Sequence, residues 1–121
     1  TLRQREHFLK MNGREIFKNA VRVMEYAGRT LLDRHSLTPE DIAHVIPHQA
    51  NARIVESLSQ RLSVPIEKFY CNLERYGNTS AASIPLALDE ARRAGLFKPN
   101  ELGLLVAFGA GLTWASALIR F

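Results

Sequence analysis

The sequence has very little cysteine: Cys71 is the only one among 121 residues. A single cysteine excludes an internal disulfide and any metal site built from several cysteines. This scarcity is typical of proteins from a reducing compartment, so we expect a cytoplasmic protein. The composition is not that of a disordered protein, because 46% of the residues are apolar and 23% are charged. These proportions fit one globular domain or a large piece of one.

The sequence also has no recognisable signal peptide. Residues 1–11 contain no apolar core and no small-residue cleavage site, and the chain does not begin with Met. This start predicts a cut inside a longer protein rather than a targeting segment.

One uncharged stretch, residues 102–119, reaches the lower length limit of a membrane-spanning helix. The sequence Gly109-Ala110-Gly111 interrupts it at the middle, and strand-forming residues flank this break on both sides. The stretch therefore predicts two buried strands joined by a tight turn, with no membrane span.

The charge balance is basic: 16 Lys and Arg against 12 Asp and Glu give a net charge of +4. Twelve of the 16 cations are Arg, which suits bidentate contacts with phosphate or carboxylate. An anionic partner is therefore expected. The basic residues are mixed with acids and form no run with interleaved aromatic residues, which argues against nucleic acid as that partner.

The apolar spacing predicts alternating helices and strands. The expected elements are a helix starting at the Asn12/Glu15 cap and running to residue 32, a single turn at 38–41, a buried strand at 44–47, a helix through 54–62, a short strand around 69–72, a helix at 79–94 ending at Gly95, and the two final strands. The segment 66–73 is ambiguous. This order predicts an α/β fold in which helices pack on a mixed sheet that ends in an antiparallel hairpin.

Three turns carry candidate functional residues. His48 directly follows the strand at 44–47, at the sheet edge where open α/β sheets bind ligands. Asn78 lies in Gly77-Asn78-Thr79-Ser80-Ala81-Ala82-Ser83, which opens a helix. A third turn, residues 109–113, brings further backbone N–H groups. Simpler interpretations remain open: a loop histidine bonded to backbone, a helix-capping asparagine and an ordinary tight hairpin.

These motifs resemble one protein family. His48-Gln49-Ala50-Asn51, the block at 77–83, the Gly111-Leu112-Thr113-Trp114 turn and the end at 117–121 are similar to the C-terminal portion of β-ketoacyl-acyl-carrier-protein synthase III. The segment 11–18 resembles it as well. The paired motifs are far more specific than a single glycine pattern, and the match extends over nearly the whole chain in order.

The resemblance implies that residues 1–121 form the C-terminal half of a thiolase-like fold, in a protein that works as a homodimer. It implies a decarboxylative Claisen condensation of an acyl-CoA starter with malonyl-acyl carrier protein, which initiates fatty acid synthesis. His48 and Asn78 would be two members of the catalytic triad. The reaction would use no metal and no cofactor, since acyl-CoA and malonyl-acyl carrier protein are substrates.

The family nucleophile is a cysteine of the N-terminal half, which this sequence does not contain. Cys71 lies between Tyr70 and Asn72 in a segment expected to be buried, so we interpret it as a small core residue. The chain alone is therefore expected to be inactive.

The resemblance assigns the carrier-binding segment to Gln49, Ala50, Asn51, Ala52 and Arg53. Arg53 would meet the acidic surface or the phosphopantetheine phosphate of the carrier protein, although a solvated helix charge is the simpler alternative. Weaker candidates for the CoA tunnel, also by resemblance, are Arg14 and Phe17.

Two other functions remain open. One is a related condensing enzyme of secondary metabolism with a different starter or acceptor. The other is a non-catalytic interaction module that keeps the dimer surface and the carrier-binding surface. Residues outside this sequence distinguish these hypotheses, above all an upstream cysteine.

Overall fold

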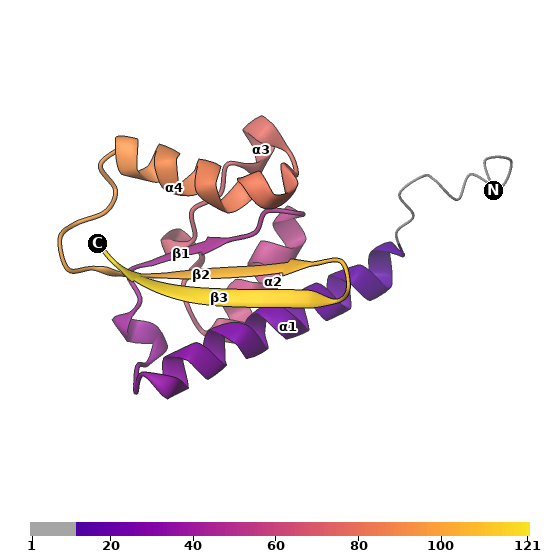
Figure 1. The fold of residues 1–121 in the computed structure, drawn as a ribbon, viewed down its shortest axis with the longest axis horizontal. Helices are drawn as coiled ribbons and strands as arrows, with labels where there is room; N and C mark the ends of the chain where they lie inside the picture. Colours follow the sequence, from indigo (N-terminus) through magenta and orange to yellow (C-terminus); the bar gives the residue numbers. More distant parts are fainter. Residues whose placement is uncertain (1–11) are drawn as a thin grey trace, which may run out of the picture.

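The computed structural model describes residues 12–121, which form a three-stranded mixed sheet with helices on both faces (Figure 1). The elements in chain order are α1 (Gly13–Arg34), η2 (Pro39–Asp41), β1 (His44–Pro47), α2 (Ala52–Leu62), η3 (Ile66–Lys68), α3 (Leu73–Tyr76), η4 (Ser80–Ala82), α4 (Ser83–Arg93), β2 (Leu102–Gly109) and β3 (Thr113–Arg120). The α/β class predicted from the sequence is confirmed.

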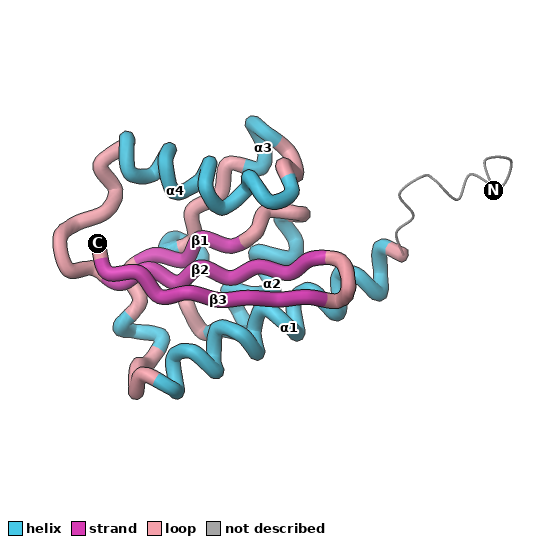
Figure 2. The backbone as a smooth tube through the Cα atoms, viewed as in Figure 1, coloured by secondary structure: helices cyan, strands magenta, loops and turns pink. Residues whose placement is uncertain are grey.

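The sheet has the order β1-β2-β3 (Figure 2). β1 pairs with β2 in parallel, with His44 opposite Gly103 and Pro47 opposite Val106. β2 and β3 form the predicted antiparallel hairpin, with Leu102 opposite Arg120. The uncharged stretch therefore forms two strands, and no helix of residues 12–121 is long and apolar enough to cross a membrane.

The core lies between one face of the sheet and the helices α1 and α2. Met24, Leu58, Leu62, Leu104 and Val106 are almost completely buried there. The other face carries α4, where Ile84 faces a small apolar hollow shared with alanines of β2 and β3. Figure 1 shows α4 and α1 on opposite sides of the strands, which gives three layers.

Helix caps predicted from the sequence are present. The Asn12 side chain accepts a hydrogen bond from the Glu15 backbone N–H, and the Asp41 carboxylate accepts one from the Thr38 N–H at 2.7 Å. Gly95 follows α4 with φ of +71°, the left-handed conformation that ends a helix.

Two elements differ from the prediction. Residues 69–72 make only one parallel bridge, from Phe69 to Val45, because the Gln49 side chain takes the hydrogen bonds that a neighbouring strand would have made. Regular helix begins at Ser83 rather than at Thr79. Ser80 has φ of +53°, which an α-helix cannot contain, so the preceding turn is the 3-10 segment η4.

Gly28 of α1 allows the helix to approach both α2 and the sheet. A Cβ atom there would lie 3.1 Å from a methyl carbon of Leu62 and 3.4 Å from one of Leu104, whereas nothing lies within 4 Å of a Cβ at Gly13. We expect Gly28→Leu to destabilise the full-length protein by about 1–3 kcal/mol through overpacking.

Gly13→Leu serves as the control, because it adds the same side chain to the same helix without a clash. Thermal unfolding followed by circular dichroism measures both variants. Equal melting temperatures for the two would show that α1 does not pack closely at Gly28.

Candidate active site

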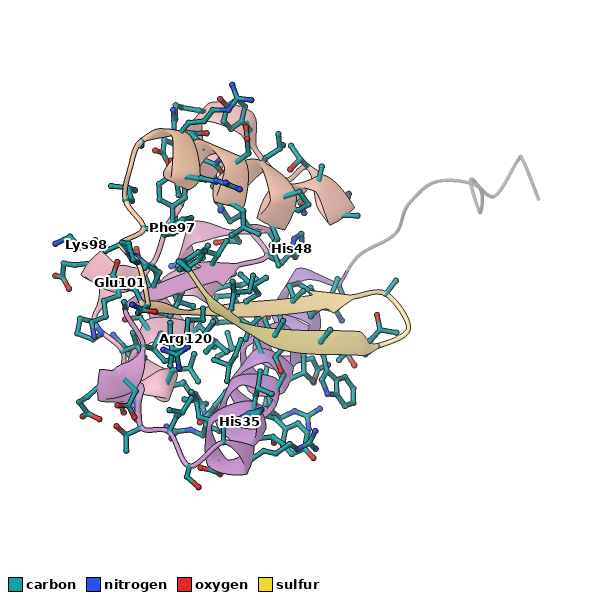
Figure 3. All side chains as sticks on the ribbon, turned by 60° about the vertical axis from the view of Figure 1, so that its left-hand side comes forward. His35, His48, Phe97, Lys98, Glu101 and Arg120 are labelled. Carbon is teal, nitrogen blue, oxygen red and sulfur yellow. The ribbon has the colours of Figure 1, made fainter. Side chains whose placement is uncertain are left out.

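The candidate site lies at the carboxyl end of the parallel strands. His48 follows β1, and its backbone N–H donates to the Val106 carbonyl at 2.8 Å, which continues the pairing with β2 by one residue. This hydrogen bond fixes the histidine beside β2. Figure 3 shows His48 at the opposite end of the sheet from Glu101 and Phe97.

A pocket of about 340 Å³ brings the predicted turns together. Its lining residues come from the loop after β1, from the small-residue block at the start of α4 and from the end of β2: His48, Asn78, Ser80, Ala81, Ser83, Ile84, Ala107, Phe108, Gly109 and Ala110. His48 is half-buried and Asn78 is exposed. Positions thirty residues apart in sequence thus share one pocket, as the hypothesis of a single site required.

His48 sits among uncharged groups. Its Nδ1 lies 2.6 Å from the Ser83 hydroxyl oxygen, and the Phe108 ring lies edge-on with centroids 5.4 Å apart. Burial lowers the pKa of His48, which favours the neutral imidazole. Among residues 12–121, Nε2 has no hydrogen-bond partner, so this nitrogen is free for a ligand.

Among residues 12–121, Asn78 makes hydrogen bonds through only one end of its amide. Its Oδ1 accepts a hydrogen bond from the Ser80 N–H at 2.9 Å, just before α4. The capping interpretation and the functional one are therefore compatible. Because Oδ1 is held by a donor, the Nδ2 hydrogens remain available at the pocket.

Gln49 has a role that the sequence did not reveal. Its side chain is only 1% exposed, donating through Nε2 to the Tyr70 carbonyl at 3.3 Å and accepting through Oε1 from the Asn72 N–H at 2.7 Å. Asn72 in turn donates to Glu90 of α4 at 3.0 Å. Gln49 thus anchors the loop that leads to Asn78, and its amide is not available at the surface.

The other residues of the predicted carrier-binding segment lie farther out. Asn51 caps α2 by accepting from the Arg53 N–H at 2.9 Å, Ala50 is half-buried, and Ala52 and Arg53 are exposed. A second hollow of about 750 Å³ brings Arg53 together with Arg14 and Phe17 of α1. This hollow shares no lining residue with the His48 pocket.

Cys71 does not line either hollow. Burial, and then the charge of Glu74, raise the pKa of the Cys71 thiol to about 11. The thiol is therefore a poor nucleophile, in agreement with its interpretation as a core residue.

An unpredicted cluster occupies the far end of the sheet. The Phe97 and Phe121 rings stack with centroids 3.9 Å apart, and His44 Nε2 lies 3.0 Å from a carboxylate oxygen of Glu101. A hollow of about 800 Å³ adjoins these rings between α4 and the end of β3. It is larger than the His48 pocket, but its residues do not belong to the three predicted turns.

Known proteins match this chain over nearly its whole length. Residues 32–121 match the C-terminal domain of 3-oxoacyl-[acyl-carrier-protein] synthase III. A β-ketoacyl-[acyl-carrier-protein] synthase III from Caldanaerobacter subterraneus subsp. tengcongensis is 54% identical over 121 residues, which is 100% of this chain and 37% of that relative.

Solved structures agree with the sequence match. The 3-oxoacyl-[acyl-carrier-protein] synthase III of Aquifex aeolicus superposes with a TM-score of 0.92 at 49% identity, covering 94% of this chain and 37% of that one. The corresponding enzyme of Thermus thermophilus gives a TM-score of 0.88 at 54% identity, covering 93% of this chain and 35% of that one.

The chain thus spans little more than a third of the length of these relatives. Their thiolase-like fold agrees with the helices and mixed sheet found here. The chain belongs to the β-ketoacyl-[acyl-carrier-protein] synthase III family and corresponds to the C-terminal part of its members.

Proposed function

We propose that the protein containing this chain is a β-ketoacyl-acyl-carrier-protein synthase III. It would condense an acyl-CoA starter with malonyl-acyl carrier protein and release CO2, the first condensation of fatty acid synthesis. The observation that carries the proposal is the pocket lined by both His48 and Asn78, whose Nε2 and Nδ2 make no hydrogen bond within residues 12–121.

Two uncharged N–H donors suit this decarboxylation. As CO2 leaves, the electron pair of the breaking C–C bond moves onto the malonyl thioester and develops an enolate oxygen. The donors bond the enolate oxygen more strongly than the neutral carbonyl, which lowers the barrier. The enolate carbon then attacks the acyl thioester on the enzyme, and the cysteine sulfur is the leaving group.

The environment of His48 supports this assignment. A neutral imidazole donates one N–H without giving up a full proton, and the lowered pKa keeps it neutral. The pocket residues bring no second titratable side chain near the enolate position. The reaction moves electron pairs between substrates and one cysteine, so we propose that it needs no metal and no cofactor.

The nucleophile belongs to sequence outside these 121 residues. This chain supplies two of the three catalytic groups, and by itself it would be inactive. We also propose that the whole protein is cytoplasmic, as the scarcity of cysteine in this chain predicts, and that it works as a homodimer, as the family resemblance implies.

The carrier protein would dock near the start of α2. Asn51, Ala52 and Arg53 are exposed there, and Ala50 lies beneath them. Arg53 would bind an acidic group or the phosphopantetheine phosphate, while Arg14 and Phe17 across the same hollow would contact the CoA side. Gln49 would contribute by positioning the neighbouring loop rather than by touching the carrier.

Removing either donor should abolish most of the decarboxylation. We expect His48→Ala and Asn78→Ala to lower kcat for malonyl-acyl carrier protein decarboxylation by about 10²–10³-fold, as for the loss of an oxyanion-hole donor. Acyl transfer from acyl-CoA to the enzyme should persist. Radiolabelled CO2 release and acyl labelling of the full-length protein measure the two steps.

Residues of the same types outside the pocket provide the controls. His35→Ala and Asn19→Ala lie outside the pocket and should retain wild-type rates of both steps. Full decarboxylation by either pocket variant would disprove the assigned role. Absence of any acyl acceptance by the wild-type protein would favour a non-catalytic carrier-binding module.

Arg53 should affect the carrier substrate selectively. We expect Arg53→Glu to raise KM for malonyl-acyl carrier protein at least tenfold and KM for acyl-CoA by less, because acyl-CoA carries the phosphopantetheine phosphate but lacks the acidic protein surface of the carrier. Steady-state kinetics at low ionic strength measures both parameters.

Arg22→Glu on the exposed side of α1 makes the same charge change away from the hollow. An equal rise of KM in both variants would mean that only the overall charge matters, and would remove the docking assignment.

Cys71 should stay unmodified during turnover. With a pKa of about 11, about one thiol in a thousand is ionised at pH 8, so native Cys71 should resist iodoacetamide and react only after unfolding. Mass spectrometry of the acylated full-length protein should place the acyl group on another cysteine. An acyl group on Cys71, or an inactive Cys71→Ala variant, would contradict this.

A further inference from the structure

Among the residues that the structure describes, Ser83 is the one whose side chain forms a hydrogen bond with the His48 imidazole. It is the first residue of α4 and is only 3% exposed. Its hydroxyl oxygen lies 2.6 Å from His48 Nδ1, and it accepts a longer hydrogen bond of 3.4 Å from the Gln49 backbone N–H. Ser83 takes part in no step of the proposed decarboxylation.

The number of available hydrogens decides which group donates in the short hydrogen bond between Ser83 and His48. A serine hydroxyl has one hydrogen to donate and two lone pairs that accept. Gln49 donates into one lone pair. If Nδ1 also donated, the buried hydroxyl hydrogen would need another acceptor, and none is present among the residues that the structure describes. If Nδ1 accepts, every group is satisfied, which is the rule for buried polar atoms.

His44, at the start of β1, gives an internal comparison. Its Nε2 lies 3.0 Å from a carboxylate oxygen of Glu101. His48 has a hydroxyl in the corresponding role, and its ring otherwise meets the edge of Phe108. No charged side chain lines its pocket. The hydrogen-bonding neighbour of His48 is therefore uncharged, whereas that of His44 is a carboxylate.

We propose that Ser83 is a positioning residue that donates its hydroxyl hydrogen to His48 Nδ1 and thereby holds the imidazole neutral with its only hydrogen on Nε2, facing the pocket. The functional value of this tautomer rests on the proposed function, since the opposite tautomer would present a lone pair to the enolate oxygen. Ser83 touches no substrate and acts only through His48.

The direct test is the tautomer itself, in the full-length protein labelled with ¹⁵N-histidine. The His48 signals are those absent from the His48→Ala protein. We expect a pyrrole-like shift for Nε2 and a pyridine-like shift for Nδ1 at neutral pH. A pyrrole-like Nδ1, or a doubly protonated ring, would overturn the proposal whether or not the enzyme is active.

The kinetic test removes the hydroxyl with Ser83→Ala. We expect kcat for malonyl decarboxylation to fall about tenfold or more with little change in KM. Loss of the donor to Nδ1 also favours the imidazolium, so the acid limb of the pH–rate profile should move to higher pH. Ser83→Thr, which keeps the hydroxyl, should restore the wild-type pH profile.

Ser59→Ala is the matched control. Ser59 is also buried, and its hydroxyl donates a comparable 2.7 Å hydrogen bond to the Val64 carbonyl, far from the pocket. It should lower thermal stability without changing the pH profile. An unchanged pH profile for Ser83→Ala, or a profile shifted equally by Ser59→Ala, would overturn the positioning role.

The two sets of results separate this inference from the proposed function. If the wild-type ring carries its hydrogen on Nε2 while His48→Ala decarboxylates normally, the proposed function fails and the tautomer assignment stands. If His48→Ala is inactive and the wild-type ring is protonated on Nδ1, the proposed function stands and the role of Ser83 fails.

Discussion

The parallel pairing of β1 with β2 is the constraint on which the site depends. Four residues of β1 lie beside Gly103–Val106, and the His48 N–H extends the ladder to the Val106 carbonyl. Because both strands end at the same edge, the loop after β1 and the turn after β2 must meet there. Packing of α1 and α2 against Leu104 and Val106 holds this register, since a shift by one residue would turn these side chains out of the core.

A network of hydrogen bonds connects this edge of the sheet to the loop that leads to Asn78. The Gln49 side chain forms hydrogen bonds with the backbone of Tyr70 and Asn72. The Asn72 side chain in turn donates a hydrogen bond to Glu90 of α4. Removing one hydrogen-bonding group would leave buried amide groups without partners. The network therefore favours a single position of the loop. The loop then ends at Gly77, whose φ of +68° lets the chain turn into the block that begins with Asn78.

The electrostatics of the pocket follow from what surrounds it. The side chains around His48 that line the space are uncharged, and the hydroxyl of Ser83 forms the hydrogen bond with the imidazole. Partial burial without a neighbouring anion favours a neutral histidine, which can donate a hydrogen bond but has little tendency to release a proton. The far end of the sheet has the opposite arrangement, with Glu101 beside His44. His44 at the start of β1 thus lies beside a carboxylate, whereas His48 just after β1 lies beside a hydroxyl.

Local patterns in the sequence were sufficient for most of the fold. Apolar spacing predicted α1, β1, α2 and the final hairpin, and the Asn12 and Thr38 caps were predicted because capping depends on neighbours within three residues. The candidate pair His48 and Asn78 followed from turn motifs and family resemblance.

Only the tertiary structure decided the start of α4, the single bridge at Phe69, the burial of Gln49 and the Ser83 contact. Each of these depends on hydrogen bonds between residues 20 or more positions apart, or on a backbone angle that no local pattern specifies.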